Sequence, residues 1–321
     1  MQNIVKFSPR VIGSAVQGRL HYKNNIECQD RINMCKSGKV VSIALSDGAG
    51  SYSNSGIGAE EITKRVSNNL CINFIKIIKR SKGEIKKRII AEINRTLRLL
   101  VKNHALDKKE FSCTLLFVVS DGNRFVAGHI GDGVIGSFRG NKIDVISTPE
   151  NYDFSNVTTF ITNSDLSKHL RIYIGSSHLC DGYVLMSDGS TDSLYSKKNN
   201  KLSKSLLEIK KWTQNYPNEM VNVALEKNMK EFIRKRTHDD CSLIMMVMIE
   251  KSHHQLRMSH KNYLLELLNA KNKISLKNRM KVLYQISNNK INSTQLISDK
   301  TSLSESTVRN HKNILNELIY N

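Results

Sequence analysis

Six short runs of β-forming residues, each followed by turn residues, constrain the fold of this chain more than any other feature. The steps Asp121-Gly122 and Gly140-Asn141 lie between neighbouring runs and are typical of tight hairpins. We therefore expect the strands to pair antiparallel. The runs are VVSIALS (40–46), CTLLFVV (113–119), RFVAGHI (124–130), KIDVIS (142–147), YVLMS (183–187) and SLIMMVMI (242–249).

Two long segments between the first two runs carry apolar residues at helical spacing. One stripe extends from Ala59 to Ile77 and the other from Ile85 to Leu100. A third helical region, over about 203–235, is interrupted by Pro217, which breaks helices. Hairpin strands with helices laid outside them predict an α+β sandwich, not a parallel doubly wound sheet.

The length of the chain and a change in composition predict a second, smaller domain. At 321 residues the chain exceeds the size at which a single core usually stops growing. After Glu250 the sequence reads KSHHQLRMSHKN, which is polar, basic and without periodicity, as in a linker. We expect a main domain over residues 1–250, a linker over 251–262 and a helical domain over 263–321.

The chain is strongly basic, with 49 Lys and Arg against 29 Asp and Glu and a net charge of +20. Such a surplus favours an anionic partner such as nucleic acid, or a solvated basic surface. The six cysteines form no C-x-x-C pair, and no apolar run approaches the roughly 18 residues that span a bilayer. We therefore expect a cytoplasmic protein with reduced cysteines and no membrane partner.

Acidic residues recur at the ends of the β-type runs. A single Asp-Gly step is more often a turn than a ligand, but several carboxylates that converge on one place repel one another unless cations hold them. Glycine after the Asp lets the backbone approach an ion closely, and such oxygen-rich sites suit Mg²⁺ or Mn²⁺. The acidic motifs are Gln29-Asp30, Ser46-Asp47-Gly48, Gly131-Asp132-Gly133, Ser187-Asp188-Gly189 and His238-Asp239-Asp240.

Taken in order, these motifs resemble the metal-dependent protein phosphatases of the 2C type over about residues 10–250. The bacterial branch of the family is most similar, because three of its signatures occur in this sequence. They are His21 with Cys28-Gln29-Asp30, SDGAGS (46–51), and Pro149-Glu150 with Asn156, Thr158 and Phe160. The resemblance implies a four-layer sandwich of two antiparallel sheets flanked by helices. It also implies one-step hydrolysis of phosphoserine and phosphothreonine in proteins by a metal-activated water. In signal transduction, a cognate serine/threonine kinase would phosphorylate the proteins that this enzyme dephosphorylates.

The resemblance further implies a centre of two Mn²⁺ or Mg²⁺ ions, to which some bacterial members add a third. Asp47 would be the catalytic carboxylate that bridges both ions, Gly48 would offer its carbonyl, and Asp30 would hold the water shell of the second ion. The remaining matches are Asp188 and Asp239, in preference to Asp240, for the first ion, and Asp132 with Asp192 for the weaker third ion of some bacterial members.

Two departures from the family pattern concern proton transfer and phosphate binding. Eukaryotic members carry a His directly after the bridging Asp-Gly as a proposed general acid, whereas this chain has Ala49. An Arg that holds phosphate in many members is also missing before Gln29-Asp30. Arg19, His21 or Lys23 could bind the phosphate instead, and His21 is in addition a candidate catalytic acid or base.

The C-terminal part reads as three short helices over 278–290, 293–301 and 304–319. The segment LSESTVRNHKNILNEL resembles the recognition helix of LuxR-type helix-turn-helix proteins. That resemblance implies a small all-α helix-turn-helix domain that binds duplex DNA through Arg309, Asn310, His311 and Lys312. A helical docking module with a solvated basic face is the alternative.

Two functions are therefore predicted for the whole chain. The first is a serine/threonine protein phosphatase with a DNA-binding or docking module. The second is a non-catalytic, phosphatase-like sensor domain fused to a transcription regulator. The complete acidic set favours the enzyme, because a decayed domain would not need Asp30, Asp47, Asp188 and Asp239 together. The sequence leaves the oligomeric state open.

Overall fold

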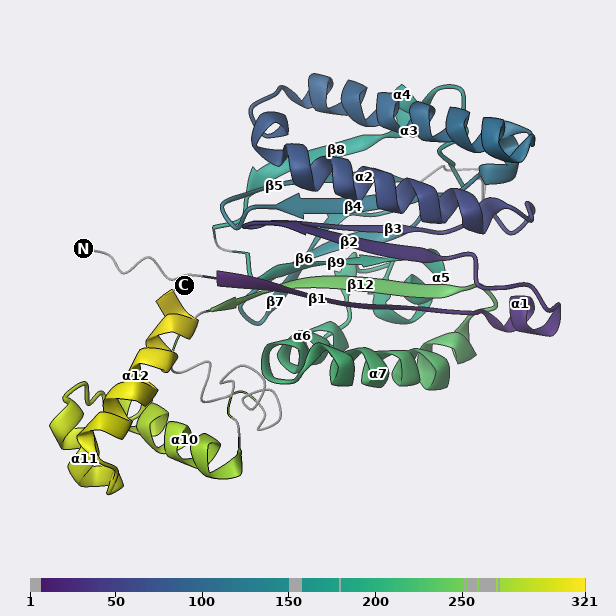
Figure 1. Cartoon of the computed structure of the whole chain (residues 1–321). Coiled ribbons are helices and arrows are strands. Elements are labelled where there is room, and N and C mark those ends of the chain that lie inside the picture. The colour runs from purple at the N-terminus through teal and green to yellow at the C-terminus, as the bar shows by residue number, and fades with distance from the viewer. Residues whose placement is uncertain are drawn as a thin grey trace. The chain divides into compact units, whose positions relative to one another are not determined.

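The computed structural model in Figure 1 describes residues 7–149, 158–178, 180–250 and 272–320, together with Ser252, Ser259 and Ala270. The chain forms two compact units. The first consists of Val11–Lys210 and Val221–Val247, and the second takes in the residues up to Arg10, Lys211–Met220 and the chain from Met248 onward. The predicted linker and the start of the predicted helical domain lie mostly outside the described residues.

Two five-stranded antiparallel sheets form the centre of the first unit. One has the order β2-β3-β4-β5-β8, with Arg31–Ser37, Val40–Ser46, Leu115–Ser120, Arg124–Ile130 and Arg171–Ser176. The other has the order β1-β12-β9-β6-β7, with Phe7–Val16, Cys241–Glu250, Gly182–Met186, Val134–Arg139 and Lys142–Ser147. A small two-stranded sheet pairs β10 (Tyr195–Ser196) with β11 (Lys201–Leu202).

The predicted strands are present, and three of them have the predicted bounds. These are β3, β5 and β7. The hairpin across Asp121-Gly122 is confirmed, because β4 pairs with β5 there. The turn at Gly140-Asn141 also joins paired strands, but the partner of β7 is β6 and not the predicted run 124–130, which forms β5 of the other sheet. Four strands of the two large sheets were not predicted, namely β1, β2, β6 and β8.

The two predicted long helices, α2 (Ser55–Ile77) and α3 (Lys82–His104), cover the sheet that contains β3 and β4 (Figure 1). The predicted apolar stripes from Ala59 to Ile77 and from Ile85 to Leu100 are buried in the core. A capping box between Ser81 and Glu84 begins α3. Each buried Ile, Leu or Phe contributes about 1.5–3 kcal/mol of transfer free energy, so this face holds the layers together.

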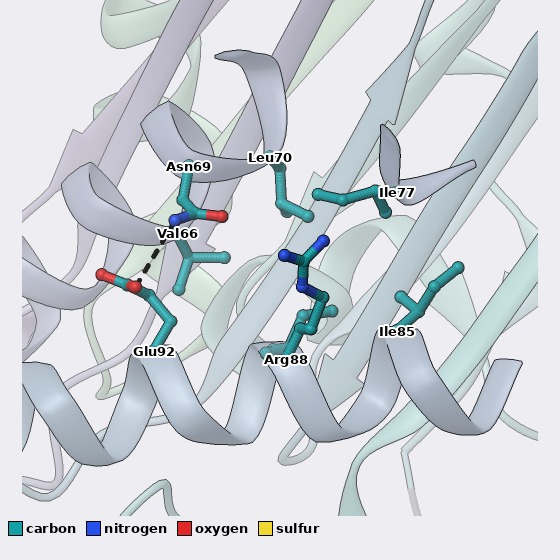
Figure 2. A pocket seen from close by; sticks show the side chains of 8 residues that line it. Val66, Asn69, Leu70, Ile77, Ile85, Arg88 and Glu92 are labelled. Carbon is teal, nitrogen blue, oxygen red and sulfur yellow. Dashed lines mark hydrogen bonds between the residues drawn. The ribbon is translucent and has the colours of Figure 1, made fainter. Parts of the chain in front are cut away.

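Packing between α2 and α3 is nearly complete. A cavity of about 10 Å³ lies between them, with room for roughly one water. Figure 2 shows the side chains that line it. At its edge, Asn69 Nδ2 donates to Glu92 Oε2 over 3.4 Å, while Val66, Leu70 and Ile85 supply apolar walls. The cavity therefore reflects packing rather than a binding site.

The other helical segments are shorter. The predicted break at Pro217 is confirmed, because it separates α6 from α7. The outer position of α7 is fixed in part by Gly13 of β1, whose N–H donates to Asn222 Oδ1 over 3.1 Å. The segments are α1 (Arg19–Lys23), η1 (Lys108–Phe111), α4 (Leu166–His169), α5 (Asp188–Leu194), α6 (Ser205–Asn215), α7 (Asn218–Asn228), η2 (Met229–Ile233) and η3 (Arg234–Arg236).

Three helices in the C-terminal part confirm a helical region there: α10 (Lys273–Ser287), α11 (Thr294–Thr301) and α12 (Glu305–Tyr320). The side chains of Asn272 and Ser293 accept hydrogen bonds from Ser275 N and Leu296 N and cap the first two helices. The three helices share a small core of Leu276, Val282, Leu283, Ile297, Val308 and Leu315.

All six cysteines are free thiols, as the sequence predicted. Within the described ranges, no helix combines the length and the apolar character that crossing a bilayer requires.

Candidate metal centre

Three carboxylates meet between the two large sheets. One oxygen each of Asp47, Asp132 and Asp188 lies within 4.8 Å of the other two. Asp47 follows β3 of one sheet, and Asp188 follows β9 of the other. Asp132 lies in the connection between β5 and β6, where the chain passes from one sheet to the other. The fold thus brings together acidic residues that are far apart in the sequence.

Burial and mutual repulsion raise the pKa of two of these carboxylates, Asp47 and Asp188. Burial raises the pKa of Asp47 well above its usual value, and the charges of Asp30 and Asp188 raise it further. Burial, followed by the charge of Asp132, raises the pKa of Asp188 to about 6. Converging carboxylates with this property are stabilised when a cation binds between them.

Asp30 is the fourth acidic group of this region and is only 1% exposed. Neither of its carboxylate oxygens makes a hydrogen bond of normal geometry, although the nearby hydroxyls of Ser242 and Ser187 lower its pKa. Burial outweighs them and raises the pKa of Asp30 to about 7. A buried carboxylate without a hydrogen-bond partner is costly, so this oxygen-rich set fits a hard divalent cation.

The turn after β3 is tightly constrained around Asp47. Its backbone N–H donates to Thr114 Oγ1 over 2.9 Å, and its carbonyl accepts from Thr114 N over 2.8 Å. Gly48 follows, where a Cβ would lie 2.8 Å from Ser55 Oγ and 2.9 Å from Gln29 Cβ. Only glycine fits without displacing these neighbours.

Two further predicted ligands lie outside the group of three. The side chain of Asp239 is exposed, but its charge contributes to the raised pKa of Asp188. Asp192 is also exposed, one helical turn after Asp188 in α5. Asp132, which the sequence assigned to a third ion, lies beside Asp47 and Asp188 and accepts a hydrogen bond from Thr158 Oγ1 over 2.5 Å.

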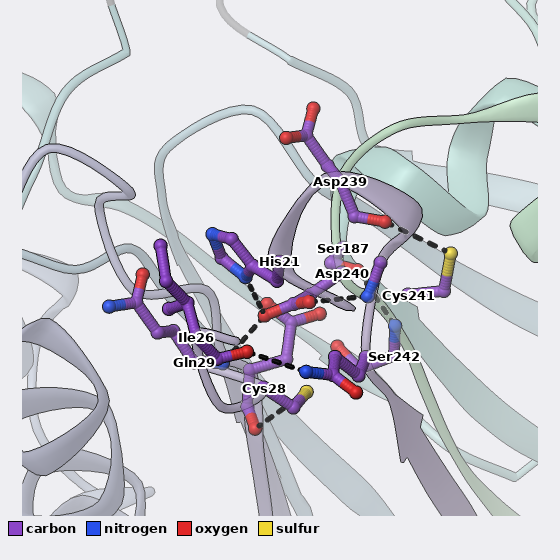
Figure 3. A network of polar contacts seen from close by, with 12 residues as sticks. His21, Ile26, Cys28, Gln29, Ser187, Asp239, Asp240, Cys241 and Ser242 are labelled. Carbon is purple, nitrogen blue, oxygen red and sulfur yellow. Dashed lines mark hydrogen bonds and ion pairs between the residues drawn. The ribbon is translucent and has the colours of Figure 1, made fainter. Parts of the chain in front are cut away.

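The three candidates for phosphate binding all lie on α1. Arg19 and Lys23 are exposed, and Arg19 Nε donates to the Thr237 carbonyl over 2.9 Å. His21 is more enclosed, and its Nδ1 lies 2.9 Å from Asp240 Oδ2 (Figure 3). Sequence reasoning missed this partner of His21, because it weighed Asp240 only as a possible metal ligand.

The four residues predicted to bind DNA have different surroundings. Arg309 and Asn310 are exposed on α12. His311 is instead 5% exposed and accepts a hydrogen bond from Arg279 Nε over 3.3 Å, so it belongs to the helical core and not to an outer face. Lys312 Nζ donates to the Asn292 carbonyl and, over 3.4 Å, to Thr294 Oγ1. Burial, with the charge of Arg279, lowers the pKa of His311.

One motif used in the sequence comparison cannot be placed. The segment from Glu150 to residue 157 lies outside the described residues, so Asn156 has no described position. Thr158, at the end of this motif, is the residue that donates to Asp132.

Known proteins with similar sequence and structure are phosphatases. The chain is 26% identical over 178 residues to serine/threonine-protein phosphatase 3 of Escherichia coli, a match that covers 51% of this chain and 67% of that protein. Among solved structures, the catalytic domain of the phosphatase PstP in complex with two manganese ions matches with a TM-score of 0.54 and 14% identity, over 76% of this chain and all of that one. The serine/threonine phosphatase of S. agalactiae matches with a TM-score of 0.53 and 17% identity, over 76% and 100%.

At these identities the solved structures establish the fold, which is the two-sheet α+β sandwich of the phosphatases. The family itself is established by sequence. A profile described as protein phosphatase 2C matches residues 17–234, which contain Asp30, Asp47, Asp132 and Asp188. The chain therefore belongs to the protein phosphatase 2C family and is an enzyme of the serine/threonine phosphoprotein phosphatase class.

Proposed function

We propose that this enzyme hydrolyses phosphoserine and phosphothreonine in proteins with two bound Mn²⁺ or Mg²⁺ ions. The observation that carries the proposal is the convergence of Asp47, Asp132 and Asp188 within 4.8 Å beside the unpartnered carboxylate of Asp30. Family membership supports the same conclusion. A cognate protein kinase would supply the substrate, and the six free thiols agree with a reducing cytoplasm.

Within this proposal the acidic residues have distinct roles. Asp47 would contribute to holding both ions, together with the Gly48 carbonyl and Asp30 for the second. Asp188 and Asp239 would hold the first ion, and Asp132 and Asp192 would hold a third, weaker one. When bound, such ions activate water and neutralise charge on the phosphoryl oxygens. Arg19 and Lys23, both exposed on α1, are suited to attract the phosphorylated segment.

The test is hydrolysis of p-nitrophenyl phosphate and a phosphothreonine peptide by the purified full chain. We expect turnover with added Mn²⁺ and none with excess EDTA. Turnover that persists in EDTA would refute metal dependence. No turnover with Mn²⁺ or Mg²⁺ on either substrate would favour the second candidate, a non-catalytic sensor domain fused to a regulator.

We also propose that the helices α10, α11 and α12 bind duplex DNA, through Arg309 and Asn310 with Lys312 near a phosphate. Support comes from the exposure of Arg309 and Asn310 and from eight Lys or Arg against three Asp or Glu in residues 272–320. Phosphate contacts release counterions, so affinity should fall steeply with salt. A gel-shift titration of the full chain tests this, and no binding at low salt would favour a protein-docking role.

A further inference from the structure

The buried carboxylate of Asp240 forms hydrogen bonds with several residues of the segment 18–29, which precedes Asp30. Asp240 is 3% exposed and accepts three hydrogen bonds (Figure 3). Gly18 N donates to Oδ1 over 2.6 Å, Gln29 N donates to Oδ2 over 2.6 Å, and His21 Nδ1 lies 2.9 Å from the same Oδ2. Asp240 therefore holds both ends of residues 18–29 and the imidazole ring between them, which leaves it little capacity to bind a metal ion.

Further contacts hold the same segment against residues 237–240. Leu20 N donates to the His238 carbonyl over 3.1 Å, next to the contact between Arg19 Nε and Thr237. At Gly18 an added Cβ would lie 2.4 Å from the Asp239 carbonyl carbon and oxygen. The backbone approaches this closely because position 18 has no side chain. The position of His21 is thus set by several independent contacts.

The hydrogen bond to Asp240 also fixes which ring nitrogen of His21 is available. Nδ1 is occupied, and Nε2 faces Gly50, where an added Cβ would lie only 3.7 Å away. Gly50 is three residues after Asp47, in the turn that bears the acidic cluster. Ala49, the residue between Gly48 and Gly50, cannot donate a proton. His21 Nε2 therefore reaches the turn in which other family members carry their acid.

We propose that Asp240 is a positioning residue that orients His21, and that His21 Nε2–H protonates the departing serine or threonine oxygen. This rests on the proposed phosphatase function. In the step, a water oxygen forms a bond to phosphorus and releases one proton to solvent, while the bond from phosphorus to the substrate oxygen breaks. The electron pair stays on that oxygen, which takes the proton from Nε2. Solvent then reprotonates the imidazole, and the products are inorganic phosphate and a free hydroxyl side chain.

The two substrates differ in their need for this proton. A serine or threonine alkoxide is a poor leaving group and requires protonation, whereas p-nitrophenolate is stable and leaves without it. A residue that only binds phosphate or only holds the fold would affect both substrates alike. The ratio of the phosphothreonine rate to the p-nitrophenyl phosphate rate therefore isolates proton donation.

The experiment measures this ratio with Mn²⁺ for wild type, His21→Ala and Asp240→Asn. Donation of a proton contributes about 10²-fold or more, so His21→Ala should lower the ratio about 10²-fold. Asn retains the shape of Asp240 with one acceptor oxygen fewer, and loss of such an orienting partner should lower the ratio about tenfold. His178→Ala, at an exposed histidine outside this segment, is the matched control and should leave the ratio unchanged.

A second measurement does not depend on activity. In the metal-free protein, the Nδ1–H proton of His21 should give a proton NMR resonance protected from exchange, absent in His21→Ala and lost in Asp240→Asn. Equal losses on both substrates in the two variants would overturn proton donation while the phosphatase function stands. An inactive wild-type protein would refute that function and the donation together. A His21 resonance that persists in Asp240→Asn would overturn the role of Asp240.

Discussion

Ionisable side chains are buried both in the first unit, called the phosphatase unit below, and in the C-terminal helices α10, α11 and α12. The two regions differ in whether these side chains have hydrogen-bond partners. In the phosphatase unit, burial and neighbouring carboxylates raise the pKa of Asp30, Asp47 and Asp188. In the C-terminal helices, burial lowers the pKa of Arg279, and burial with the charge of Arg279 lowers that of His311. There the neutral imidazole accepts a hydrogen bond from Nε of the guanidinium, whereas Nη1 of Arg279 is buried without a hydrogen-bond partner among the described residues.

This difference separates a site from a structural contact. Asp240 needs no further ligand, because its oxygens accept three hydrogen bonds. Asp30 is as deeply buried as Asp240 but makes no hydrogen bond of normal geometry. A buried charge with partners stabilises the fold, whereas one without partners indicates a missing ligand.

The largest effect is expected for Asp47→Asn, which removes the carboxylate shared by both proposed ions. Activity with Mn²⁺ should fall by at least about 10³-fold, equivalent to about 4 kcal/mol of lost transition-state stabilisation. The metal-free variant should be no less stable than wild type, because one repelling charge is gone. Steady-state kinetics and thermal unfolding measure both effects. Asp144→Asn, an exposed aspartate of β7, is the control, and comparable activity in the two variants would contradict the role of Asp47.

The second prediction concerns the pH dependence of the metal-free phosphatase unit. The unfolded chain loses the Asp30 proton near pH 4, whereas the folded protein keeps it up to about pH 7. The folded state binds more protons in this window, so the free energy of unfolding should decrease with rising pH, by at most about 4 kcal/mol from this group. Urea unfolding at several pH values measures the slope.

Two comparisons control this measurement. Asp30→Asn should flatten the slope, and saturating Mn²⁺ should remove it because the cation stabilises the ionised carboxylates. A slope identical in wild type and Asp30→Asn would show that folding does not raise the pKa of Asp30.

The third and smallest prediction has the opposite sign and concerns the C-terminal helices. Because the pKa of His311 is lowered on folding, the unfolded segment binds a proton first as pH falls below about 6.5. The stability of these helices should therefore be complete above that pH and decrease in acid. We expect amide protection in α10 and α12 of the full chain to fall by pH 5.5, by at most about tenfold, after correction for intrinsic exchange. His311→Gln should remove this dependence, and an unchanged slope in the variant would exclude His311 as its source.

Burial explains which strands were predictable from the sequence. Every residue of β3 and β4 is buried, so both appear as continuous apolar runs. The unpredicted strands β1, β2 and β8 lie at the edges of their sheets, where polar residues such as Lys36 of β2 face solvent and interrupt the pattern. The interior strand β6 contains Gly136, which weakens a strand signal.

The acidic residues of the candidate site were predictable from the sequence, but the contact between His21 and Asp240 was not. Asp47, Asp132 and Asp188 stand beside glycines at strand ends, which identified them before any geometry was known. His21 and Asp240 are separated by 219 positions, and only the folded chain brings them together. Spacing along the sequence carries no information about such a contact.

The acidic cluster takes residues from both sheets, so it is complete only after the ribosome has made the chain up to Asp188. Asp47 belongs to one sheet, Asp188 emerges from the ribosome 141 positions later and belongs to the other, and Asp132 joins them. A nascent chain that ends before Asp188 lacks part of the cluster, even if its first sheet has formed. Ion loading and the onset of catalysis should therefore follow completion of the sandwich, so that incomplete translation products release no phosphate.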